Sequence, residues 1–182
     1  VLRKKLAARD KTLEAQLPNL EQQLRTRMTA RAAQPETFYP LKAPSVKGPK
    51  GVKFTPQKDG SFLVTGTNPA KATYTLEFST DVKEISGLKI EALTDASLKA
   101  QGPGRTAHGN FVLNNIQAYA TDSAKFDVKK HRVTLSASRA DFAQDKWPAI
   151  HAIDGKIGEG KKGTGWAVAP HYGKPHWLIV TT

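Results

Sequence analysis

Short runs of strand-forming residues, separated by turn-forming residues, fill the chain from about residue 52 to its last residue. Residues 72–80, 88–92 and 131–138 alternate apolar and polar positions, residues 61–65 follow an Asp-Gly turn, and residues 177–182 form a last apolar run. A period of two places successive side chains on opposite faces of a β-strand. Because the runs are short and no second helical pattern interrupts them, we expect an all-β domain over residues 52–182, specifically a jelly-roll β-sandwich.

Two of these segments carry further expectations. Residues 110–120 form a longer run whose apolar phase changes near Asn114, which is typical of a bulged strand. The run 177–182 ends where the sequence ends. Because a sandwich needs strands that cover its edges, we expect the domain to be truncated at its C-terminal end.

Residues 1–34 have a different periodicity. Their apolar positions recur at intervals of three, four and seven residues: Leu2, Leu6, Leu13, Leu17, Leu20, Leu24 and Met28. This spacing predicts one face of a basic amphipathic helix. Pro18 lacks an amide donor, so we expect either a helix or a helical hairpin kinked near Leu17. Such a thin apolar face needs a neighbour, either the following domain or another part of the parent protein.

Residues 35–51 join the two regions. Six prolines and glycines fall within them: Pro35, Pro40, Pro44, Gly48, Pro49 and Gly51. This density of residues that break regular structure predicts an extended connector.

Composition excludes several functions. The chain has no cysteine, which excludes a disulfide framework and thiolate chemistry. No stretch approaches the roughly 18 apolar residues of a membrane span. The net charge of +12 is spread over many loops, which is typical of a solvated surface, so we do not expect nucleic acid as a partner. The first residue, Val1, indicates a fragment of a larger protein.

A glycine-bearing loop supplies the first candidate binding residues. Within residues 93–113 it holds Arg105, His108 and Asn110, which can donate hydrogen bonds to a ligand. The alternative is structural, because buried loop carbonyls need partners that Arg105 and Asn110 can provide.

Three further segments, rich in aromatic residues, supply the remaining candidate binding residues. The segments 140–155, 163–167 and 171–177 contain three tryptophans and one tyrosine. Trp147, His171 and Tyr172 could stack on sugar faces and bond sugar hydroxyls. Trp166 and Trp177 are expected in the core. The chain has no Gly-x-Ser-x-Gly turn and no recognisable pair of catalytic carboxylates, so we expect no enzymatic activity.

Several short sequence words resemble known families. Residues 152–155 (AIDG), 164–166 (TGW) and 175–177 (PHW) resemble the discoidin, or coagulation-factor type C, pattern. Over residues 55–177 the chain also looks like the region between the conserved domains of planctomycete-type multidomain cytochrome c proteins, on the words 102–105 (GPGR), 109–113 (GNFVL) and 166–170 (WAVAP). The resemblance implies a galactose-binding-like fold. This chain departs from that family because it lacks a Cys-x-x-Cys-His haem motif, so the resemblance implies no redox activity for it.

These observations predict a non-catalytic carbohydrate-binding module of a larger extracytoplasmic protein, located in the periplasm or at the cell surface. Its partners would be a polysaccharide or other glycan, an anionic one being compatible with the charge, and the other domains of the parent protein. The alternative is a structural or protein-docking domain of a multidomain cytochrome c-type protein. We expect no cofactor in this chain apart from a structural calcium ion, which many such sandwiches carry.

Overall fold

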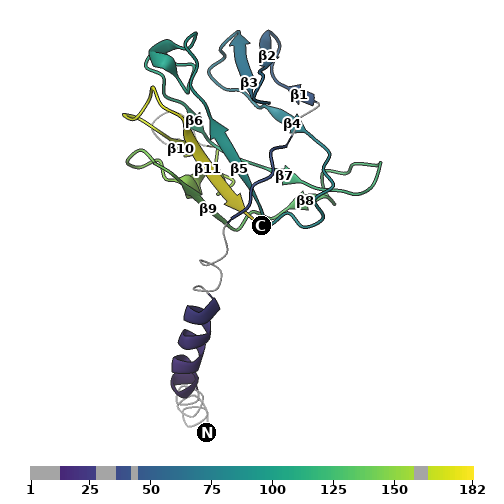
Figure 1. The fold of residues 1–182 in the computed structure, drawn as a ribbon, viewed down its shortest axis with the longest axis vertical. Helices are drawn as coiled ribbons and strands as arrows, with labels where there is room; N and C mark the ends of the chain where they lie inside the picture. Colours follow the sequence, from purple (N-terminus) through teal and green to yellow (C-terminus); the bar gives the residue numbers. More distant parts are fainter. Residues whose placement is uncertain (1–12, 28–35, 42–44, 158–163) are drawn as a thin grey trace. The chain divides into compact units, whose positions relative to one another are not determined.

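The computed structural model describes residues 13–27, 36–41, 45–157 and 164–182. The chain divides into two compact units, Val1–Tyr39 and Pro40–Thr182 (Figure 1). Among the described residues no helix is long and apolar enough to cross a membrane.

The described part of the first unit contains a helix over residues 13–27. The helix continues through Pro18, so a hairpin broken near Leu17 is wrong for these residues. A proline removes a single backbone hydrogen bond, and the leucine, glutamate and glutamine residues around it are strong helix formers. Leu13, Leu17, Leu20 and Leu24 are spaced as one face and are 49–55% exposed. Leu2, Leu6 and Met28 lie outside the described residues.

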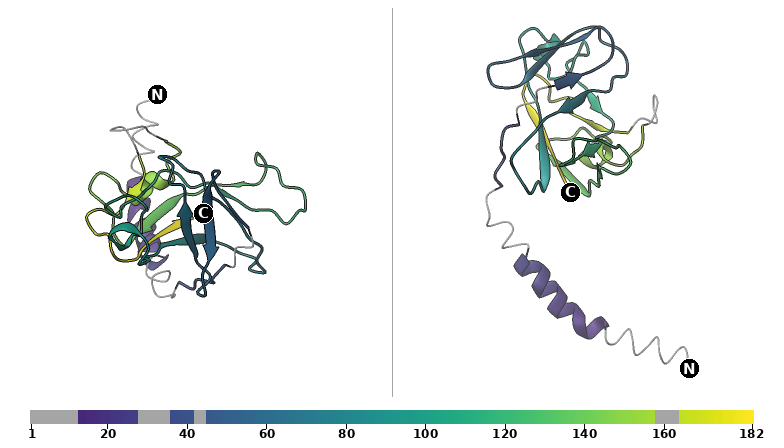
Figure 2. Two further views of the ribbon diagram at one scale, coloured as in Figure 1. Left: turned by 90° about the horizontal axis from the view of Figure 1, so that it is seen from above. Right: turned by 90° about the vertical axis from the view of Figure 1, so that its right-hand side faces the viewer.

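The regular structure of the second unit consists mainly of short antiparallel strands (Figures 1 and 2). The strands are β1 (Ser45–Lys47), β2 (Val52–Pro56), β3 (Phe62–Gly66), β4 (Thr75–Glu77), β5 (Gly87–Ala92), β6 (Val112–Leu113), β7 (Ala118–Tyr119), β8 (Arg132–Val133), β9 (Ala137–Ala140), β10 (Trp166–Ala167) and β11 (His176–Thr181). Two 3₁₀ turns, η1 (Lys99–Gln101) and η2 (Ala149–Ala152), lie between them. The expectation of a β-rich domain is confirmed.

The strands pair in small sheets. β11 lies between β5 and β9, while β1–β4, β2–β3, β6–β10 and β7–β8 form antiparallel pairs. Both edges of β11 are therefore paired within the described chain, although it is the last strand in sequence. The proposed truncation beyond it stays a prediction.

Three expected strands are confirmed to within one residue at each end, because β3, β5 and β11 overlap the runs at residues 61–65, 88–92 and 177–182. The expected connector over 35–51 differs, since it contains β1. The run at 72–80 keeps regular structure only in β4, whose residues are all exposed.

Two expected strands divide into shorter ones. The run 110–120 becomes β6 and β7 instead of a single bulged strand, and the run 131–138 becomes β8 and the start of β9. Between β6 and β7 the Asn114 side-chain Nδ2 donates to the Thr164 carbonyl at 2.6 Å, and the Ile116 backbone amide donates to the Ala152 carbonyl at 2.7 Å. The segment between β6 and β7 thus bonds to residues outside the expected strand, which interrupts the ladder.

The core lies between the inner face of the β5–β11–β9 sheet and the β6–β10 pair with η2. Its fully buried members include Trp166, Val168, Leu178 and Val180. The Trp166 indole donates to the Phe142 carbonyl at 2.8 Å, which satisfies its polar atom. The expectation that Trp166 is a core residue is confirmed.

Trp177 differs from the expected core position. It alternates with the core residues of β11 and therefore lies on the opposite face of the strand. The Arg139 guanidinium carbon lies 5.5 Å from its ring centroid, and the Lys89 ammonium lies 6.0 Å away. These cations cover a partly exposed ring.

Candidate functional site

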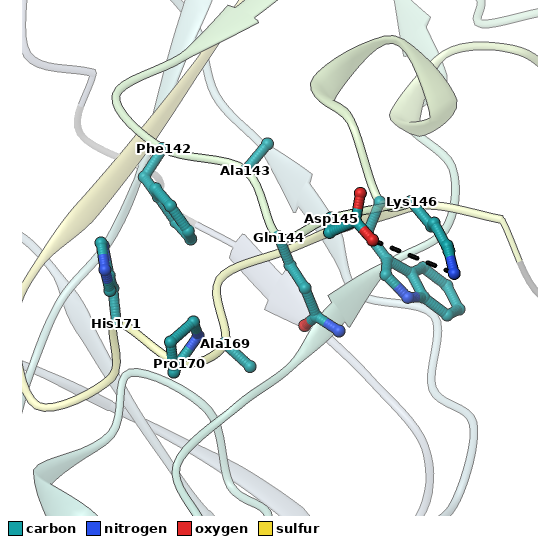
Figure 3. Close-up of a pocket in the computed structure, with 9 residues that line it drawn as sticks. Phe142, Ala143, Gln144, Asp145, Lys146, Ala169, Pro170 and His171 are labelled. Atoms are coloured by element: carbon teal, nitrogen blue, oxygen red, sulfur yellow. Dashed lines mark ion pairs between the residues drawn. The ribbon is translucent and has the colours of Figure 1, made fainter.

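A shallow groove lies between the loop that follows β9 and the loop that follows β10 (Figure 3). Residues 142–147 and 169–171 line it, and its volume is about 870 Å³. The Gln144 amide donates to the Ala167 carbonyl at 2.8 Å, which fixes the first loop against β10. The groove therefore rests on the core strands.

Aromatic and polar side chains share the groove. The rings of Phe142 and His171 stack with centroids 4.1 Å apart and planes 27° apart. Trp147 also lines the groove and is partly buried. Gln144, Asp145 and Lys146 add an amide and two opposite charges to the lining. Flat apolar faces next to hydrogen-bonding groups are the combination that sugar rings require.

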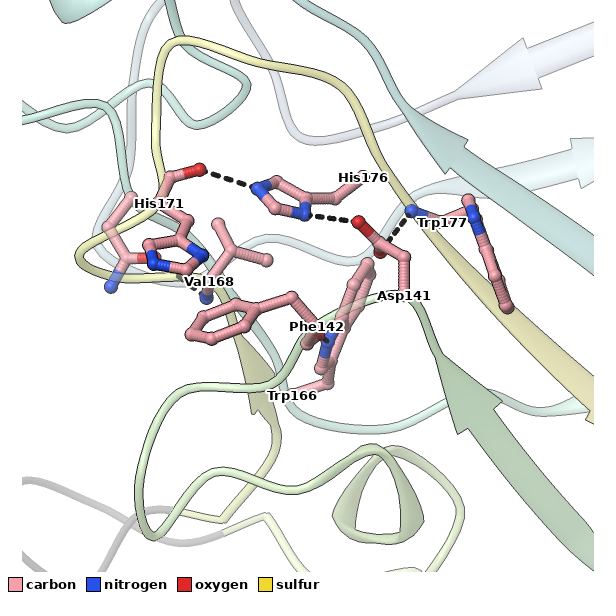
Figure 4. Close-up of polar contacts among 8 residues, drawn as sticks. Asp141, Phe142, Trp166, Val168, His171, His176 and Trp177 are labelled. Carbon is pink, nitrogen blue, oxygen red and sulfur yellow. Dashed lines mark hydrogen bonds and ion pairs between the residues drawn. The ribbon is translucent and has the colours of Figure 1, made fainter.

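A buried histidine holds the second loop from behind (Figure 4). The His176 side chain is fully buried, and its Nδ1 lies 2.7 Å from Asp141 Oδ2. Its Nε2 lies 2.5 Å from the carbonyl oxygen of His171. A carbonyl only accepts hydrogen bonds, and so does an ionised carboxylate. Both bonds are therefore made together when both ring nitrogens carry a proton.

The carboxylate of Asp141 is held in its charged form. Partial burial raises the pKa of Asp141. The bond from the Trp177 backbone amide, the bond to the His176 ring and the charge on that ring together lower this pKa by more, so the net pKa lies below the usual value. The Trp177 amide donates to Asp141 Oδ1 at 2.8 Å. Asp141 thus links β11 to the loop that carries Phe142.

This arrangement predicts a loss of stability in acid. Because the pKa of Asp141 is lower in the folded state, the unfolded chain takes up its proton first as the pH falls, and the free energy of unfolding decreases below about pH 4. Urea unfolding at pH 5, 4 and 3, followed by tryptophan fluorescence, measures the decrease. Asp141→Asn should lose less stability than the unmodified chain over this interval, and equal losses would contradict the assignment.

The structure brings together most of the residues singled out in the sequence. Trp147 and His171 line the groove. Asn110 lies behind it, where its amide donates to Gln144 Oε1 at 3.0 Å and its Oδ1 accepts from the Val168 amide at 3.1 Å. Asn110 is 9% exposed, so it positions the groove loops.

His108 and Tyr172 form a second ring pair beside the groove, with centroids 6.1 Å apart. Tyr172 follows His171 directly and is 38% exposed. The two loops are joined by a hydrogen bond from the Gly173 amide to the Gly102 carbonyl at 2.7 Å. Both residues are thus accessible extensions of the same loop cluster.

Arg105 is separate from this cluster. Its Nη2 donates to the Gly66 carbonyl at 2.8 Å, and its own carbonyl accepts from the Asn68 amide at 3.0 Å. The structural role considered for Arg105 is therefore present. Asn110 also has a structural role, but its backbone partner is an amide, where a carbonyl was expected.

Sequence reasoning did not single out Phe142, Gln144, Asp145 and Lys146, which complete the groove. They lie within the aromatic-rich segment 140–155, so the segment was found but not its contributing side chains. The described residues include no group of three or more histidine, aspartate or glutamate side chains placed to hold a metal ion. The calcium ion stays a prediction.

Comparisons of the chain with protein-family models, curated proteins and solved structures gave no match. The resemblance to discoidin-like domains and to cytochrome c-associated regions therefore remains a prediction.

Proposed function

We propose that the second unit is a galactose-binding-like jelly-roll sandwich that acts as a non-catalytic carbohydrate-binding module of a larger extracytoplasmic protein. The observation that carries the proposal is the groove in which Trp147 and the stacked Phe142–His171 pair lie beside polar side chains. The antiparallel strands beneath it suit a rigid scaffold, and loops placed on a scaffold commonly carry binding residues.

A sugar would use both kinds of side chain in the groove. The apolar C–H face of a pyranose packs on aromatic rings, while its hydroxyl groups exchange hydrogen bonds with amide and charged groups. Gln144 is held by Asn110 on one side, so its side chain is oriented before a ligand arrives. Such preorganisation lowers the entropy cost of binding.

Removing the indole of Trp147 should weaken glycan binding by at least about tenfold, because the ligand loses much of the apolar area that it buries. Affinity electrophoresis of the full chain, in gels containing neutral, sulfated or uronic polysaccharides, compares Trp147→Ala with the unmodified protein.

Trp177→Ala is the matched control, since it also removes an indole but lies on β11, outside the groove lining. It should bind as the unmodified chain does. Equal losses in both variants, or no retardation of the folded chain by any polysaccharide, would refute the groove as a glycan site.

A second candidate function is docking onto other domains of the parent protein. The exposed leucine face of the helix at residues 13–27 favours it. Four leucines at intervals of four, three and four residues are typical of a helix that packs lengthwise on an apolar partner.

A further inference from the structure

A second pocket lies apart from the groove, where β3 meets the loop around η1. It is lined by residues 64–65, Asn68, residues 97–99 and Arg105, and its volume is about 270 Å³. Two of these side chains are cationic, three are neutral and polar, and none is acidic. The composition of the lining therefore favours an anionic ligand.

The guanidinium of Arg105 is held in place before any ligand binds. Its Nη2 bond to the Gly66 carbonyl fixes one end, and the bond from Asn68 to the Arg105 carbonyl fixes the backbone. An arginine that is already ordered loses less side-chain entropy on binding than a free surface lysine. The loop thus presents a positioned cation.

The same guanidinium is incompletely satisfied. Its Nη1 is shielded from solvent and has no hydrogen-bond partner in the part of the chain that the structure describes. A charged donor removed from water without an acceptor costs free energy. An oxyanion is the acceptor that best matches a guanidinium in geometry and charge.

The charge of the pocket is not neutralised locally. Within the described chain, neither Lys99 nor Arg105 forms an ion pair with an acidic side chain. The acidic residue nearest in sequence is Asp95, whose Oδ1 accepts from the Ser97 amide at 2.8 Å and from its hydroxyl at 2.6 Å. That carboxylate oxygen is engaged with Ser97.

We propose that this pocket binds the sulfate or carboxylate group of an acidic polysaccharide. The proposal rests on the carbohydrate-binding function for the polymer that carries the anion, and it adds an anion subsite distinct from the aromatic groove. The groove would stack on the sugar rings, and the pocket would select polymers that bear oxyanions.

Backbone amide shifts of the full chain, recorded by NMR at constant ionic strength, test the pocket directly. Sodium sulfate replacing sodium chloride should cause saturable shifts at Thr65, Ser97, Lys99 and Arg105. Lys99→Gln should weaken this binding by roughly tenfold, because one of two nearby charges is lost. Lys125→Gln removes the same charge from the β7–β8 loop and should leave the affinity unchanged.

Oligosaccharides of equal length then identify the source of the anion. Sulfated and uronic forms should shift the pocket amides, whichever of the two binds more tightly, and a neutral form should not. Non-saturating shifts, or equal losses in Lys99→Gln and Lys125→Gln, would overturn the anion subsite. Stronger pocket binding by single-stranded DNA of equal charge would overturn its assignment to a polysaccharide.

The two proposals can be refuted separately. If the groove binds no sugar, Trp147→Ala and the unmodified chain migrate alike in the polysaccharide gels, whereas the sulfate titration measures binding at the pocket alone. Arg105→Lys keeps the charge but loses the guanidinium geometry. It should weaken sulfate binding while the amide spectrum stays folded, and unchanged affinity in this variant would contradict the role of the guanidinium.

Discussion

Gly104→Ala is expected to destabilise the second unit by about 3 kcal/mol or more, because the added methyl group would overlap the backbone carbonyl of Asn110. A backbone carbonyl cannot move aside as a flexible side chain can. The Gly104 amide also donates to the Gly109 carbonyl at 2.7 Å, so the two sides of this loop are already in close contact. The substitution must open the loop.

Opening the loop should disturb both candidate sites. Arg105 would lose its position beside Gly66, and Asn110 would lose its bonds to Val168 and Gln144. We therefore expect weaker binding of sulfate and of glycan in the same variant. Urea denaturation measures the loss of stability, and the two binding assays described above measure the rest.

Gly60→Ala is the control for this substitution. Gly60 lies in the turn between β2 and β3, where an added methyl group meets no atom within 4 Å. Its φ of +86° still disfavours alanine, so we expect a loss of about 1 kcal/mol without an effect on binding. Similar losses at positions 60 and 104 would show that the close contact at Gly104 is relieved cheaply.

The sequence was most informative where a strand is both regular and half-buried. β5 is such a case, because the alternation of Leu88, Ile90 and Ala92 with charged residues predicts the strand, and these three positions are the more buried ones. The same alternation over residues 72–80 predicts a strand longer than β4, which covers only Thr75–Glu77. Tyr74 and Leu76 remain 40% and 56% exposed, so a period of two does not by itself specify what a strand packs against.

The candidate site depends on contacts that no local pattern contains. Trp147 and His171 belong to different loops and share the groove because the Gln144 amide bonds to Ala167 in β10. Arg105 is close to His108 in sequence, yet it turns toward β3 instead of the aromatic cluster. Residue types were sufficient to nominate the loops, but tertiary hydrogen bonds decide which side chains meet.

The second large effect is expected at Asp141. Replacing it with alanine should destabilise the domain by about 3 kcal/mol, because the buried His176 ring loses the acceptor for its Nδ1 proton. The Trp177 amide loses its partner in the same variant. The loop that carries His171 should also loosen, since His176 binds the His171 carbonyl, and glycan affinity should fall with it.

Asp141→Asn distinguishes hydrogen bonding from charge at this position. The asparagine oxygen can still accept from the Trp177 amide, and its NH2 group can donate to Nδ1 of a His176 ring that keeps a proton on Nε2, facing the His171 carbonyl. Asparagine should therefore cost only about 1 kcal/mol, as measured by urea denaturation beside the alanine variant. A loss for asparagine that matches alanine would show that the negative charge of Asp141, and not its hydrogen-bonding geometry, holds the loop.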